Sequence, residues 1–247
     1  MIKFFRKIRY NLMSENKTSK YFKYAIGEIL LVVIGILIAL QINTWNEQRK
    51  QQITVNKLFL NLESSLKTDS LALSSIITRS KNSMSSMNLA LTTPADKLLS
   101  DYTNEELIAI PRSIFEGAYS FYPKMGIYNQ MLSGNLMELI KSEELKDALL
   151  LYYDFRITRY RSLDPVMDDM YHQDFNKFMS EELKMNFFTD AIDPDANVVF
   201  DSNLILKLKD ETRKLYDLSL AVDWMLKDLE KDINSLLVII RKELGND

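Results

Sequence analysis

The residues best suited to metal chemistry are three aspartates and the chain's single histidine. Asp164, Asp168 and Asp169 lie at helical spacing, and His172 follows one turn later. Carboxylate and imidazole groups gathered on one helix face can bind a divalent cation. A solvated acidic helix face explains the pattern equally well, and the chain has no cysteine to complete a site. We therefore predict no metal and no other cofactor.

A second acidic pattern, formed by Asp193, Asp195 and Asn197, imitates the start of a calcium-binding loop. Val198 stands where the sharp turn of such a loop needs glycine, and Leu204 stands where it needs a bidentate glutamate. We interpret the segment as a turn that leads into a capped helix.

No set of side chains selects a catalytic group. The motifs that cradle phosphates, bind dinucleotides, present a nucleophilic serine or hold catalytic zinc are all missing from the sequence. Acidic residues are abundant, so an envelope hydrolase that uses paired carboxylates is the alternative function, although no motif identifies the pair. We predict no catalytic residue.

Five aromatic residues gather in the one irregular part of the chain, residues 112–142, where glycine and proline also concentrate. They are Phe115, Tyr119, Phe121, Tyr122 and Tyr128. Two interpretations stay open: these side chains pack the core at one end of a helical bundle, or they form a surface for a ligand or a protein partner.

The elements that would position these residues follow an apolar segment near the N-terminus. Residues 24–45 contain one charged side chain, Glu28, and as a helix would extend about 33 Å, enough to cross a hydrocarbon core. Tyr24 and Trp45 stand at its two ends, as aromatic residues do at membrane interfaces. We predict an uncleaved transmembrane helix. The alternatives are a buried core helix and a signal peptide, but no small-residue cleavage pattern follows the apolar run.

Three residues of the predicted span could contact another helix. Glu28 lies about one turn inside the span, where it either marks the membrane interface or pairs with a partner. Gly35 and Ala39 form a small-xxx-small pair, which permits close helix approach in lipid but is common by chance. The expected partner is a membrane or envelope protein, which includes a second copy of this chain.

The first 23 residues are basic. They carry seven lysines and arginines and one glutamate, whereas the whole chain has a net charge of −3. Because basic residues flank membrane spans on the cytoplasmic side, we predict that the N-terminus lies in the cytoplasm and the body lies outside. Apolar residues at helical spacing in this head favour contact with the lipid bilayer, and we predict no nucleic-acid partner.

The body, residues 46–247, contains two long seams of apolar residues at steps of three and four, over 48–91 and 208–244. Three polar residues interrupt the first seam: Asp69, Ser80 and Ser83. Glycine and proline are scarce, at 6 and 5 residues, which favours long helices. We predict an all-α fold, in which one transmembrane helix continues into an elongated antiparallel bundle of about four helices.

Capping residues predict where the helices of the body begin. Thr103 and Glu106 form a capping box, and the helix they start should be short because Pro111 disfavours helix at the residue before it. Ser142 and Ser202 are predicted to cap the two longer helices that follow.

The opening of the chain contains three connected stretches: YAIGEI at 24–29, VIGILIAL at 33–40, and Trp45-Asn46. With their surroundings, about 50 residues in all, they resemble the N-terminal signature of a family of single-span membrane proteins known mainly from Bacteroidota. That family is catalogued as a domain of unknown function. The resemblance implies a bacterial inner-membrane protein with its body in the periplasm. It implies no activity and no catalytic residue.

These inferences divide the chain into a basic cytoplasmic segment (1–23), a transmembrane helix (24–45) and an extracytoplasmic helical bundle (46–247). The function that this organisation favours is that of a sensory, scaffolding or interaction module of the cell envelope. We do not expect it to be an enzyme.

Overall fold

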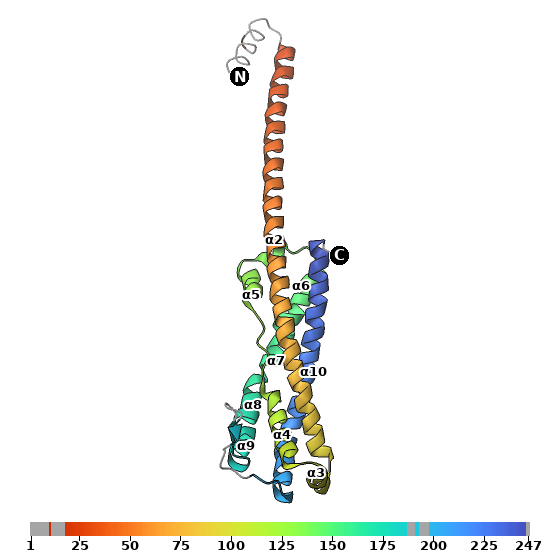
Figure 1. Ribbon diagram of the computed structural model, residues 1–247. Helices are drawn as coiled ribbons and strands as arrows, with labels where there is room; N and C mark the ends of the chain where they lie inside the picture. Colours follow the sequence, from red (N-terminus) through yellow and green to blue (C-terminus); the bar gives the residue numbers. More distant parts are fainter. Residues whose placement is uncertain (1–9, 11–17, 187–190, 193–197, 246–247) are drawn as a thin grey trace. The chain divides into compact units, whose positions relative to one another are not determined.

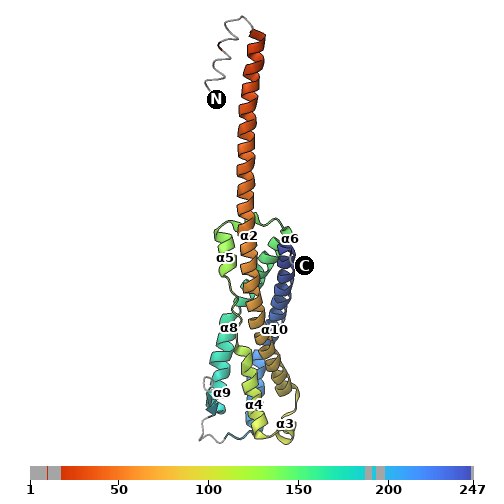
Figure 2. The ribbon, with the colours of Figure 1, turned by 45° about the horizontal axis from the view of Figure 1, so that its top comes forward.

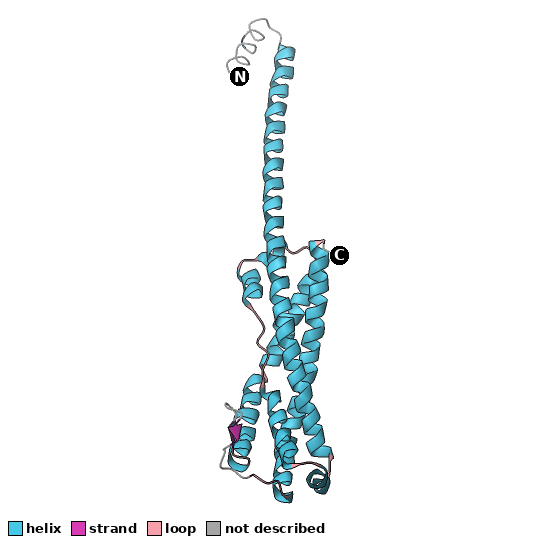
Figure 3. Cartoon of the chain, viewed as in Figure 1, coloured by secondary structure: helices cyan, strands magenta, loops and turns pink. Residues whose placement is uncertain are grey.

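The computed structural model describes residues 10, 18–186, 191–192 and 198–245. The fold is all-α, as predicted, and Figure 3 shows that helices, joined by loops, make up most of the described residues. The strands described are two residues long, β1 (Met185–Asn186) and β2 (Ala191–Ile192), and they pair antiparallel. The chain divides into two compact units, Met1–Asn56 and Lys57–Asp247.

The first unit contains the start of α2 (Thr18–Thr92), the longest helix described. One 18-residue window of this helix has a mean hydropathy of 2.6, and none of the window is buried inside the protein. Leu31, for example, is 68% exposed. Among the described residues, α2 is the one helix long and apolar enough to cross a membrane, as judged by its length and composition.

In the second unit, α2 packs against α10 (Ser202–Leu244), and the two helices run antiparallel (Figures 1 and 2). Polar contacts between them record the direction, because residue numbers fall along α10 as they rise along α2. Three pairs between the helices show this in order: Glu63 with Arg241, Ser80 with Asp223, and Asn88 with Tyr216. Thr93, the residue after α2, continues the series by accepting from Lys209. The antiparallel pairing predicted from the two seams is therefore present.

Both ends of α10 are capped. The carboxylate of Asp201 accepts a hydrogen bond from the Leu204 backbone N–H at 2.8 Å, so Ser202 is the first helical residue and not the cap that we predicted. Gly245 closes the helix with φ of 71°, a conformation that glycine adopts without the steric cost of a side chain.

The predicted capping box of Thr103 and Glu106 is confirmed at the start of α4 (Asn104–Phe115), but the predicted length of that helix is wrong. The helix continues through Pro111. Proline costs the helix one backbone hydrogen bond, but burial of Leu107, Ile110 and other side chains around it outweighs that loss. Shorter elements complete this region: α3 (Ala95–Asp101), η1 (Glu116–Ala118), α5 (Gly126–Ser133) and η2 (Leu136–Leu139).

Ser142 caps the next helix as predicted, since its hydroxyl accepts from the Leu145 backbone N–H at 3.3 Å. The helix predicted from there to about Leu183, with a kink at Pro165, is a succession of segments interrupted by a turn at residues 162–163. Two of the segments, η3 and η4, are π-helical. They are α6 (Glu143–Leu149), η3 (Leu150–Ile157), α7 (Thr158–Arg161), α8 (Asp164–Asp168), η4 (Asp169–Phe175) and α9 (Asn176–Glu182).

The core of the second unit lies where α2 and α10 meet these segments. Leu62, Leu66 and Leu73 of the first seam are completely buried. The polar residues that interrupt the seam, Asp69 and Ser83, are buried as well, at 2% and 1% exposure. Each must therefore find a polar partner inside the bundle.

Candidate functional site

The predicted contact residues of the span lie on α2. Trp45 is 63% exposed, and a β-carbon at Gly35 would meet no atom within 4 Å. Ala39 is exposed, Glu28 is partly exposed, and the side chain of Tyr24 lies outside the described set. Roles for these residues at the membrane or in a helix contact stay predictions.

The five aromatic residues of the irregular region do not form one surface. Phe115, Phe121 and Tyr128 are core residues, each with no more than 2% exposure. Tyr119 and Tyr122 are 45% and 69% exposed, so a partner surface could involve only these two of the five. The sequence could not separate the two sets because all five belong to one stretch of similar composition.

The acidic patterns do not assemble a metal site among the described residues. His172 Nε2 lies 3.9 Å from Asp168 Oδ1, one helical turn away. Within the described part of the chain, no group of three or more histidine, aspartate or glutamate side chains is arranged to hold a metal ion. The calcium-like residues Asp193, Asp195 and Asn197 lie outside the described residues.

An open groove of about 1000 Å³ separates η4 and α9 from α10 and carries acids on both walls. Several of these acids form ion pairs with lysines or arginines. Glu182 pairs across the groove with Lys207 at 2.8 Å, and Glu211 pairs with Lys214 along α10 at 2.7 Å. The groove therefore carries partly exposed ion pairs that join α9 to α10 and neighbouring turns of α10.

One buried polar layer joins four elements of the bundle. The Ser83 hydroxyl of α2 donates to the Ile114 carbonyl of α4 at 2.7 Å, and the Tyr171 hydroxyl of η4 shares a hydrogen bond with Ser219 of α10 at 2.6 Å. Burial raises the pKa of Tyr171, while hydrogen bonds from Ser219 and Ser83 oppose that rise. Ser83 and Tyr171 thus link the two bonds into a chain, which fixes the four elements in one register.

Gly117 makes the close approach in this layer possible, and its replacement by alanine gives the first testable prediction. The new β-carbon would lie 2.5 Å from Tyr171 Oη and 2.7 Å from Ser83 Oγ, closer than atoms can pack. We expect Gly117→Ala to lower the free energy of unfolding by about 1.5 kcal/mol in urea denaturation of the full chain in detergent. Gly126→Ala is the matched control, because a β-carbon there meets nothing within 4 Å. Equal stability of the two variants would contradict the prediction.

A second buried polar cluster centres on Asp69. Its carboxylate accepts a hydrogen bond from the Lys124 backbone N–H at 3.0 Å, and burial raises its pKa above the ordinary value of 3.8. Tyr153 stacks on Tyr128 with ring centres 4.3 Å apart and meets the edge of Tyr152 at 4.7 Å. Among the described residues, the buried hydroxyls of Tyr152 and Tyr153 have no direct hydrogen-bond partner. In this cluster the Asp69 carboxylate therefore has a hydrogen-bond donor, whereas the two tyrosine hydroxyls have no protein partner among the described residues.

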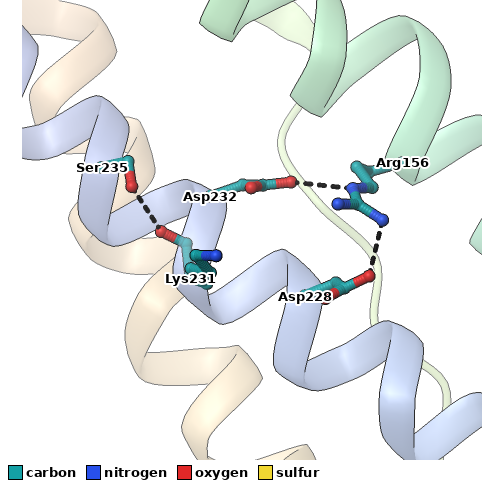
Figure 4. Close-up of polar contacts among 5 residues, drawn as sticks. All are labelled: Arg156, Asp228, Lys231, Asp232 and Ser235. Atoms are coloured by element: carbon teal, nitrogen blue, oxygen red, sulfur yellow. Dashed lines mark hydrogen bonds and ion pairs between the residues drawn. The ribbon is translucent and has the colours of Figure 1, made fainter.

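Arg156 of η3 connects this region to α10 (Figure 4). Its guanidinium donates from Nη1 to Asp228 Oδ2 at 2.5 Å and from Nε to Asp232 Oδ2 at 3.2 Å. Asp228 and Asp232 are one helical turn apart and would repel each other. The positive charge of Arg156, which lies between them, offsets that repulsion. Burial raises the pKa of Asp232, and the charge of Arg156 opposes that rise.

The fold and these contacts define a class: an all-helical protein whose described residues include one candidate membrane-spanning helix. Within that class, the chain belongs to a family of unknown function, DUF6090, whose model matches residues 28–209. The match begins at Glu28 and extends well past the opening 50 residues that carried the resemblance. No curated protein and no solved structure matches the chain.

Proposed function

We propose that this protein is a membrane-anchored helical module of the cell envelope that senses, scaffolds or binds a partner. In this proposal residues 24–45 cross the cytoplasmic membrane and residues 46–247 work in the periplasm. The observation that carries the proposal is the exposure of the apolar window of α2, none of which is buried in the protein. Water-exposed apolar surface costs about 25 cal/mol per Å², and a lipid environment removes that cost.

The orientation rests on the distribution of charge. The seven lysines and arginines of residues 1–23 precede the span, and the body carries the excess of acid. Basic flanks are retained on the cytoplasmic side during insertion, which would leave the body outside.

The character of the body favours an interaction role over catalysis. Its buried polar groups, such as the layer of Ser83, Tyr171 and Ser219, bind elements of the bundle to one another. Its open groove carries acids that are paired with bases, as for Glu182 and Lys207. Such contacts support a stable scaffold with a defined surface, which is what a binding module requires.

Membrane fractionation tests the anchor. We expect the full chain to sediment with membranes and to stay there after alkaline carbonate treatment. A variant with two arginines in the window, Ile34→Arg with Leu37→Arg, should appear in the soluble or aggregated fraction, because charge at the centre of a span opposes insertion. The matched control is Ile34→Val with Leu37→Ile. Release of the unaltered chain by carbonate would overturn the anchor.

Protease treatment of spheroplasts tests the orientation separately. Protease added outside intact spheroplasts should digest residues 46–247, with a cytoplasmic marker protein left whole as the control. Protection of the body until the membrane is lysed would show that the orientation is wrong, whatever the fractionation gives.

A further inference from the structure

The buried cluster around Asp69 contains more hydrogen-bonding atoms than the described residues provide partners for. Asp69, Tyr152 and Tyr153 are each at most 2% exposed. The carboxylate of Asp69 accepts from the Lys124 backbone N–H at 3.0 Å, although a carboxylate has room for about four donors. Within the described part of the chain, the buried hydroxyls of Tyr152 and Tyr153 have no hydrogen-bond partner. The cluster therefore has spare acceptor capacity on Asp69 and two spare O–H donors.

Three parts of the body bring these groups together. Asp69 belongs to α2, Lys124 precedes α5, and the two tyrosines are neighbours in η3. The ring of Tyr153 stacks on Tyr128 of α5 and meets the ring of Tyr152 edge-on. Burial raises the pKa of Tyr153, and the charge of Asp69 raises it further. Burial and Tyr153 raise the pKa of Tyr152, and Asp69 adds to the rise, so the carboxylate acts on both hydroxyls.

The chemistry of the unpaired groups identifies what would complete them. An unpaired hydroxyl in a protein interior costs free energy, and buried tyrosine hydroxyls usually have a partner. Neither hydroxyl bonds directly to Asp69, so the partner must both accept from a hydroxyl and donate to a carboxylate. Water does both, and a buried water needs about two to four polar partners, which this cluster supplies. A metal cation could not accept from the O–H groups.

We propose that Asp69, Tyr152 and Tyr153 form an internal water-binding site, in which bound water links the carboxylate to the two hydroxyls. A hydrogen bond through an ordered water is nearly as favourable as a direct one. The water would thus complete the polar interior and hold η3 against α2. Because η3 is π-helical, the site also lies on a type of segment that occurs frequently at functional sites. The proposal concerns the folded body alone and does not depend on the membrane anchor or its orientation.

The sign of a hydroxyl deletion tests the site, because Tyr152→Phe and Tyr153→Phe keep the ring and remove only the hydroxyl. Each variant should raise the unfolding equilibrium constant about fivefold in urea denaturation of the full chain in detergent, since a net hydrogen bond is lost. In a dry cluster the same change would remove an unpartnered polar atom, so an unchanged or lower constant in either variant would overturn the proposal. Tyr122→Phe is the matched control. Its side chain is 69% exposed, so the constant should change less than about twofold.

A double-mutant cycle tests whether the water is shared with Asp69. Asp69→Asn keeps an acceptor but removes its charge, and charged acceptors form stronger hydrogen bonds than neutral ones. Tyr153→Phe should therefore raise the unfolding constant about fivefold in the natural chain and only about twofold in the Asp69→Asn background. An effect that is equal or larger in the Asp69→Asn background would show that Tyr153 is not linked to the carboxylate, and would overturn the site.

Two measurements on the full chain in detergent identify the occupant as water. Oxygen-17 relaxation dispersion, which detects slowly exchanging internal waters, should count about one water fewer in the Tyr152→Phe/Tyr153→Phe double variant than in the natural chain. An equal count would overturn the proposal. The unfolding constant of the natural chain should also agree within about twofold in sodium, potassium and choline chloride of equal ionic strength. A larger stabilisation by sodium or potassium would assign the site to a cation and overturn the proposal as well.

Discussion

Replacing Arg156 by glutamate is expected to lower the free energy of unfolding by about 3 kcal/mol. The change removes the two hydrogen-bonded ion pairs of the guanidinium, with Asp228 at 2.5 Å and Asp232 at 3.2 Å. It also places a third carboxylate beside two that already lie one turn apart, so repulsion is added to the lost attraction. Urea denaturation of the full chain in detergent, followed by circular dichroism, measures the loss.

Two further variants make this prediction specific. Arg159 of α7 is exposed about one turn after Arg156, so Arg159→Glu should change stability by no more than about 0.5 kcal/mol. Combining Arg156→Glu with Asp232→Arg exchanges the charges of the pair and should recover about half of the loss. If Arg156→Glu and Arg159→Glu cost the same, or if the exchange recovers nothing, the contact between η3 and α10 does not hold the bundle as described.

The long helices of the body were predictable from the sequence because their signal is repeated many times. The apolar residues of the two seams recur at steps of three and four, and Leu62, Leu66 and Leu73 are buried as that pattern requires. The interruptions were equally visible. Asp69, Ser80 and Ser83 stand at seam positions, and the structure buries all three. Polar residues at apolar seam positions were thus the sequence signal from which buried polar clusters could have been predicted.

The partners of these polar residues could not be predicted, because they are distant in sequence. Asp69 meets the Lys124 backbone 55 residues away, and Ser80 meets Asp223 across 143 residues. Arg156 looked like any arginine on a helix surface, since its two acids lie more than 70 residues further on. Only the folded chain brings such groups together.

Predictions of helix ends and helix type from short sequence patterns were wrong where side-chain packing determined the structure. Pro111 was expected to end its helix, but buried neighbours in α4 carry the helix past it. The π-helical segments η3 and η4 were not predicted, because no pattern in the sequence distinguishes them from the α-helical segments on either side. The shift of the α10 cap from Ser202 to Asp201 reflects two adjacent residues that are both good caps.

Asp69 is expected to give opposite results with two substitutions of similar size. Asp69→Asn keeps an oxygen that can accept from the Lys124 N–H and removes a charge that is buried at 2% exposure, so it should raise the free energy of unfolding at neutral pH by about 1 kcal/mol. Asp69→Leu also removes the charge, but it takes away the acceptor of the Lys124 N–H and puts an apolar side chain in its place. It should lower stability by about 2 kcal/mol, as measured in the same urea titration.

The pH dependence of the Asp69→Asn effect has a definite sign. Burial raises the pKa of Asp69 in the folded protein, so folding favours its protonated form. The stabilising contribution of that form is complete below the unfolded pKa and is lost as pH rises through the higher folded pKa. The difference between Asp69→Asn and the natural chain should therefore be small in acid and should grow to a plateau toward neutral pH. Other acids titrate in both proteins and cancel from this difference. A difference that shrinks as pH rises would mean that the folded bundle prefers the ionised carboxylate, and burial would then not be the dominant influence on Asp69.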